Sequence, residues 1–161
     1  MSISAAETTH ITLDPALASR IVREGYGFGA WHGPDLRTAI DDVPATMAFR
    51  RPASGRHNIA EIVIHHAFYV RSVFERLGGT AEAFPLDGED WFALNDESAM
   101  TWTEIKALLA SLQARLVAQV GTPSSNGQTA DERMNLVLGI TCHAVYHAGQ
   151  IQLVKAFVGQ V

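Results

Sequence analysis

The chain has 161 residues, of which 47% are hydrophobic, and we expect one domain over residues 1–161 with a substantial core. Its 17 acidic residues outnumber 12 lysines and arginines, so the formal net charge is -5, and the basic residues are scattered. Because binding to nucleic-acid phosphates needs clustered cations, we expect no nucleic-acid partner.

The cysteine content and the hydropathy indicate in which cellular compartment the protein should be found. Cys142 is the single cysteine, which rules out an intramolecular disulfide and is typical of a reducing environment. The amino terminus has neither a basic start nor an apolar run, and no stretch approaches the roughly 20 apolar residues that cross a bilayer. We therefore expect a cytoplasmic protein without a membrane partner.

Helical spacing of apolar residues recurs along the chain, and no segment shows the alternation typical of a sheet, so the predicted fold is all-α. A first helix should begin at Asp14-Pro15, with the aspartate as its cap, and should fade among the glycines of residues 25–29. Residues 30–56 contain several turn formers and predict a long crossover with a short helix at residues 36–40.

Three further helices are predicted from capping boxes, in which a small polar residue stands three positions before a glutamate. The boxes are Asn58 with Glu61, Thr101 with Glu104, and Thr129 with Glu132. The first of these helices should end at Gly78-Gly79, the second before the linker at residues 121–128, and the long third one near Gly159. Four main helices in one chain suggest a bundle.

Two histidines lie on the core-facing stripe of the last predicted helix. His143 and His147 continue the spacing of Leu136, Ile140 and Ile151, so all five share one face. An unsatisfied buried polar group costs roughly 1–3 kcal/mol, so both imidazoles need partners. Each could bond to a buried polar group, or the pair could bind one metal ion, as histidines at i and i+4 do. The spacing leaves both interpretations open.

A third ligand should come from a facing helix, because metal sites in bundles usually draw on two or more helices. The second long helix offers His65 and His66. Its apolar arc is broad enough to include either residue. Helical period therefore does not choose between them.

Three segments resemble the DinB-like, or DinB/YfiT-like, metal-binding four-helix bundles. They are residues 139–155, GITCHAVYHAGQIQLVK; residues 57–65, HNIAEIVIH; and residues 30–36, AWHGPDL. The resemblance implies an antiparallel four-helix bundle with long crossover loops, often a homodimer, that holds one divalent metal ion, nickel or zinc. It also implies His65, His143 and His147 as the metal ligands and leaves His66 beside the site. Ala144 stands where many relatives carry a polar residue.

Three protein ligands leave a coordination position open, which favours chemistry over a purely structural ion. Relatives include thiol S-transferases that use low-molecular-weight thiols, and proposed hydrolases. We therefore expect a metal-dependent enzyme acting on a small molecule, with a transferase or hydrolase reaction. The alternative is a non-catalytic metal-binding or stress-response module, and a third is a bundle whose histidines only form hydrogen bonds.

Several other residues are candidates for the pocket or the second shell. Glu61 stands one turn before His65, although its capping box supplies a simpler structural role, and Gln150 follows His147 by three positions. His32, His57 and His66 could act as acids or bases, because an imidazole titrates near pH ~6.5, or could be ordinary loop and surface residues.

Cys142 precedes a candidate ligand, but adjacent helix positions point about 100° apart, so we expect a buried, inert thiol. The aromatic residues of the loop before the third long helix could roof a pocket, with core packing as the default interpretation. These residues are Phe84, Trp91, Phe92 and Trp102.

Overall fold

The computed structural model describes residues 13–27, 29, 31, 33–123 and 126–159, and these form helices and no strand. Their all-α class confirms the sequence-based prediction. The helices in chain order are α1 (Pro15–Tyr26), α2 (Leu36–Asp41), α3 (Ala45–Ala48), α4 (Ile59–Arg76), α5 (Trp102–Val120) and α6 (Ala130–Val158).

The helix starts follow the predicted caps. The Asp14 carboxylate accepts hydrogen bonds from the backbone N–H groups of Ala16 and Leu17, and proline occupies the first turn of α1. Complete capping boxes open α4, α5 and α6. The short α3 was not predicted, because four residues after a proline carry too little periodicity to be recognised.

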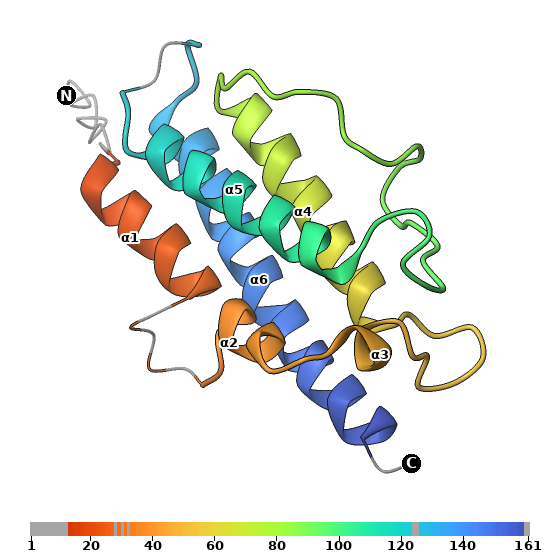
Figure 1. The fold of residues 1–161 in the computed structure, drawn as a ribbon. Helices are drawn as coiled ribbons and strands as arrows, with labels where there is room; N and C mark the ends of the chain where they lie inside the picture. Colours follow the sequence, from red (N-terminus) through yellow and green to blue (C-terminus); the bar gives the residue numbers. More distant parts are fainter. Residues whose placement is uncertain (1–12, 28, 30, 32, 124–125, 160–161) are drawn as a thin grey trace, which may run out of the picture.

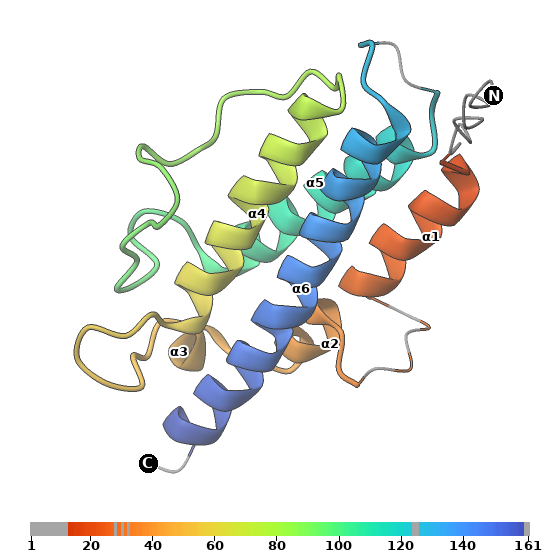
Figure 2. The same cartoon turned by 180° about the vertical axis from the view of Figure 1, so that it is seen from behind.

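The four long helices lie side by side around the core (Figure 1). α4 packs against α5 and α6, and α1 packs against the other sides of α5 and α6. In both views the long loop from α4 to α5 returns the chain to the end where α4 began, so these two helices point the same way (Figures 1 and 2). α6 runs in the opposite direction to α4, and this pair carries the candidate site.

The hydrophobic core between the helices extends into the crossover loop that joins α4 to α5. Fully buried core residues include Ile59, Ile64, Ile105, Leu109, Leu116 and Ile151. In the loop, Phe84 and Phe92 contact each other and pack edge-on against Phe68 of α4. At the start of α5, the Trp102 indole donates a hydrogen bond to the Val43 carbonyl at 2.7 Å. These three aromatic residues therefore pack the core, as the default interpretation predicted.

In the described part of the chain, no helix combines the length and the apolar character that crossing a membrane requires.

Cys142 on α6 is exposed, so the prediction of a buried thiol was wrong. The rotation between adjacent helix positions that turns Cys142 away from His143 also turns it toward solvent.

Candidate metal centre

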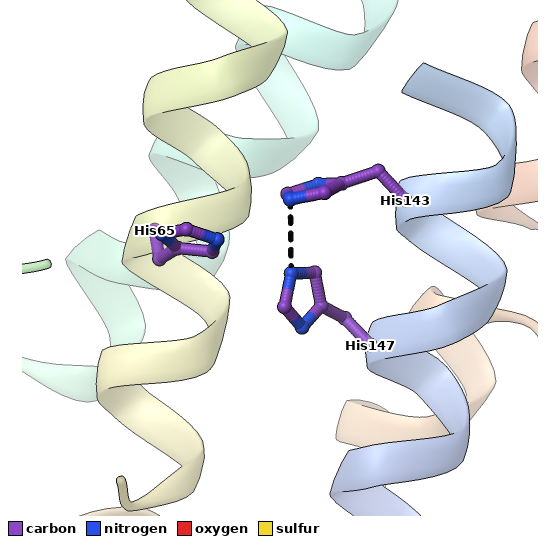
Figure 3. A group of neighbouring side chains, drawn as sticks. All are labelled: His65, His143 and His147. Carbon is purple, nitrogen blue, oxygen red and sulfur yellow. Dashed lines mark hydrogen bonds between the residues drawn. The ribbon is translucent and has the colours of Figure 1, made fainter. Parts of the chain in front are cut away.

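Three histidines from two helices converge on one point between α4 and α6. His65 comes from α4, and His143 and His147 come from successive turns of α6 (Figure 3). One nitrogen of each ring lies within 4.8 Å of the others, and the Nε2 atoms of His143 and His147 are 3.0 Å apart. The structure thus brings together the three residues that the sequence singled out.

The surroundings keep these imidazoles neutral. His65 and His147 are buried, with 5% and 2% of their surface exposed, while His143 is partly exposed. Burial lowers the pKa of His143 to about 3 and that of His147 to about 4, and it also lowers the pKa of His65. Neutral imidazoles carry the lone pair that a metal requires, so the centre is prepared for a cation near neutral pH.

The other ring nitrogen of each histidine has a fixed partner. His65 Nδ1 donates to the backbone carbonyl of Asp90 at 2.7 Å, and His147 Nδ1 donates to Gln150 Oε1 at 2.6 Å. His143 Nδ1 faces His66 Nδ1 at 2.8 Å. Such contacts orient ligand histidines in metal sites and leave the Nε2 atoms for the ion. The set of donors therefore fits a divalent metal.

His66 lies behind the centre, and its tautomer is coupled to that of His143 through their shared hydrogen bond. His66 is fully buried, burial holds its pKa well below the ordinary value, and its Nε2 atom has no hydrogen-bond partner. If His143 offers the Nε2 lone pair to a metal, its Nδ1 carries the proton and donates to His66 Nδ1. His66 then has to be the neutral Nε2–H tautomer. His66 is thus a partner of a candidate ligand.

Asp90 and Trp91, from the loop between α4 and α5, complete one wall of the centre. Asp90 has a left-handed backbone (φ 67°), and its carboxylate accepts from the Tyr69 hydroxyl at 2.9 Å. Trp91 stacks between His65 and His57, with ring centroids 3.9 and 3.7 Å away. Sequence reasoning missed Asp90, since an irregular loop carries no periodic signal. The Trp91 ring does cover the site, as the pocket interpretation proposed.

Glu61 serves the structure around the centre, and its hydrogen bonds among the described residues go to groups other than His65. Its carboxylate is paired with the Arg51 guanidinium, accepts from Leu94 N at 2.9 Å, and lies 3.1 Å from His57 Nδ1. Burial alone would raise the pKa of Glu61, but the hydrogen bonds from Arg51, Leu94 and His57 outweigh burial and hold it below the ordinary value. Glu61 joins α4 to the loops on either side.

The other predicted residues take distinct places. Gln150 contacts His147 and also donates through Nε2 to the Tyr146 hydroxyl at 2.9 Å. His57 is separated from the centre by the Trp91 ring. Ala144 is buried on α6, and His32 lies outside the described residues.

A family model described as the DinB superfamily matches residues 29–151, well over half of the chain. The chain therefore belongs to the DinB superfamily, which confirms the resemblance seen in its helices. The match includes all three converging histidines. Comparisons with curated proteins and with solved structures found no match.

Proposed function

We propose that this member of the DinB superfamily binds one divalent ion, nickel or zinc, through Nε2 of His65, His143 and His147, and is a metal-dependent enzyme acting on a small molecule. The observation that carries the proposal is the convergence of three buried or partly buried imidazoles whose Nδ1 atoms are all engaged elsewhere. Three neutral ligands leave the charge of the ion uncompensated and a coordination position open.

A bound ion would supply Lewis-acid activation of a thiol, a water or a carbonyl group. The chain's own residues orient the ligands and limit access. Asp90, His66 and Gln150 hold the three rings, and Trp91 covers His65. A thiol S-transferase that uses a low-molecular-weight thiol, or a hydrolase, is the reaction class that this arrangement supports best.

The second candidate is a non-catalytic metal-binding module, for example in a stress response. One observation favours it: Glu61, the acid nearest to the ligands in the α4 sequence, is committed to Arg51 and Leu94 and is not free to act as a base. In that case the ion would mainly stabilise the folded chain.

The proposal also covers the arrangement of the helices, the oligomeric state and the cellular compartment. We take α1, α4, α5 and α6 as the four helices of a bundle with long crossovers, in which the antiparallel packing of α4 against α6 holds the site while α4 and α5 run parallel. We also propose one domain over the chain and a homodimer in the cytoplasm, without nucleic-acid or membrane partners. The exposed apolar Leu138 and Val145 on α6 support the dimer, and the lone cysteine supports the compartment.

Metal analysis tests the site. The chain is stripped with chelator, incubated with zinc or nickel, desalted and analysed by mass spectrometry of the metal. We expect one ion per wild-type chain and a loss in His143→Ala and His147→Ala. Cys142→Ser is the matched control, since this exposed thiol precedes a ligand and should leave uptake unchanged. Uptake that survives both alanine variants would refute the site.

Activity assays separate the two candidate functions. The metal-loaded chain is tested for conjugation of a low-molecular-weight thiol to an electrophile and for ester and amide hydrolysis, with the His147→Ala variant as the blank. Turnover that depends on His147 supports an enzyme. Full metal occupancy without turnover in any of these assays would favour the non-catalytic module.

A further inference from the structure

A groove of about 550 Å³ lies beside the metal centre, between the loop preceding α4 and the carboxyl-terminal half of α6. This volume is typical of sites for small organic molecules. Two lining residues also contact the centre, because Gln150 bonds to His147 and Trp91 stacks on His65. A molecule in the groove would therefore lie against side chains that hold two of the three candidate ligands.

The walls of the groove are largely apolar. Ile62 of α4 and the Trp91 ring form one side, and Leu153 and Phe157 of α6 form the other. Leu153 and Phe157 are 62% and 65% exposed, which is high for large apolar side chains. Exposed apolar groups that gather along a concave surface are typical of binding sites for apolar ligands.

The charge of the groove comes from Arg56. No carboxylate is among the described residues that line it, and none of the ion pairs in the described part of the chain involves Arg56. The backbone of Arg56 is held in place, since its N–H donates to Ala53 O at 3.2 Å and its carbonyl accepts from Arg51 Nη1 at 2.7 Å. The neighbouring Arg51 is instead neutralised by Glu61.

From this pairing of an apolar cleft with one uncompensated cation, we propose that the groove binds a small carboxylic acid with an aryl or alkyl body. The body lies between Trp91 and Phe157, and the carboxylate pairs with the Arg56 guanidinium, whose planar fork matches it. A dianion would need a second cation, and the other titratable lining residue, His57, already faces the Glu61 carboxylate. That this acid is the substrate of the metal centre rests on the proposed function.

Calorimetric titration with phenylbutyrate and its uncharged amide tests the groove, on the metal-free and the zinc-loaded chain. We expect the acid to bind about fivefold more tightly than the amide to both forms. Arg56→Gln should abolish this preference, and Arg56→Lys, which keeps the charge but loses the planar fork, should retain part of it. Phe157→Ala should weaken the acid and the amide alike, by about fivefold. Arg23→Gln, on an exposed arginine of α1 outside the groove, is the matched control.

The outcomes separate the groove from the metal centre. Equal binding of acid and amide, no binding of either probe, or a preference that persists in Arg56→Gln would overturn the proposal. Because the metal-free chain is titrated as well, a chain that takes up no zinc yet prefers the acid would refute the proposed function and leave the groove intact. Far-ultraviolet circular dichroism checks that each variant is folded; both substituted side chains are largely exposed, so folding should persist.

Discussion

At the scale of the residue, the candidate centre depends on which nitrogen of each imidazole carries the proton. His65 and His147 donate Nδ1–H to oxygen atoms, which can only accept, so their Nε2 lone pairs face the centre. His143 differs, because its Nδ1 partner is another imidazole. His147 Nε2 can accept from His143 Nε2–H in the metal-free chain, so metal binding requires the His143 and His66 tautomers to change together.

A substitution at His66 tests this coupling. His66→Leu removes the acceptor for His143 Nδ1–H, and we expect zinc affinity to fall about 10–100-fold, the usual cost of losing such a partner. His66→Asn places an amide oxygen near the former Nδ1 position and should keep affinity within about fivefold of wild type. Competition titration with a chromophoric chelator measures both affinities.

One result for these two variants would contradict the coupling between His66 and His143. Equal affinities for the leucine and asparagine variants would mean that His66 only fills space in the core. A cobalt-loaded sample adds a spectroscopic check, since a reoriented His143 should change the visible absorption of the ion in the leucine variant and leave it nearly unchanged in the asparagine variant.

At the scale of the element, the position of α6 relative to its neighbours sets the geometry of the site. α6 supplies two of the three histidines and contacts α1 on one side and α4 on the other. Gly25 of α1 lies directly against Thr141 of α6. A Cβ atom built on Gly25 would stand 2.5 Å from Thr141 Cγ2 and 3.3 Å from Thr141 Cα. The absence of a side chain therefore allows α1 to approach α6 two residues before His143.

Gly25→Ala should therefore destabilise the fold. The Thr141 side chain cannot easily turn away, since its hydroxyl donates to Val137 O at 2.7 Å, and the backbone contact has no room to yield. We expect a loss of about 1–2 kcal/mol in the free energy of unfolding, with overpacking outweighing the gain in helix propensity. Urea denaturation of the metal-free chain measures this change in the free energy of unfolding.

Gly139→Ala is the matched control on α6. Nothing lies within 4 Å of a Cβ atom built on Gly139, which is an exposed helical position. Alanine there should stabilise the chain by up to about 1 kcal/mol through helix propensity alone. Stabilisation by both substitutions would show that α1 and α6 are not packed as closely as described.

At the scale of the whole molecule, the buried histidines couple stability to pH. Above pH about 6.5 the histidines are neutral in both the folded and the unfolded chain. Below that value the unfolded chain takes up protons, whereas the folded chain does not until pH falls toward about 4 for His147 and about 3 for His143. The metal-free chain should therefore lose stability as pH falls from about 6.5 toward 4.

Urea unfolding at pH 7.5, 6 and 5 checks this dependence. A double variant, His143→Gln with His147→Gln, removes both groups and should lose less stability between pH 7.5 and 5 than wild type does. Identical losses in the two proteins would show that other groups dominate the acid response. Glu61, whose pKa is held low, stabilises the folded chain above pH about 4.5 and adds to the loss of stability only as pH falls below that value.

Metal loading should stabilise the whole fold through mass action. An ion that binds only the folded chain adds about 2.7 kcal/mol when present at 100 times its dissociation constant. We expect the melting temperature to rise with zinc and to return after chelation, while His65→Ala shows no such response. A melting temperature that rises equally in wild type and His65→Ala would contradict binding between α4 and α6.

The sequence by itself determined the helices and the face that carries the candidate ligands. Capping boxes, the Asp14 cap and the spacing of His143 and His147 all act within about one helical turn, so they can be recognised without knowing where distant segments lie. The match to the DinB superfamily confirms the family that the same local patterns indicated. The directions of neighbouring helices were not determined in this way, since long crossovers can return the chain to either end.

The family resemblance implied His65 as the ligand, and only the tertiary structure showed where His65 and His66 lie relative to α6. Both are buried on α4, so neither burial nor helical period separates them. The approach of α6 places His65 in front of His143 and His147 and places His66 behind His143. Asp90, Trp91 and the groove at Arg56 likewise come from loops without periodicity. The physical reason is separation along the sequence. These contacts join residues tens of positions apart, so the packing of the whole chain sets them.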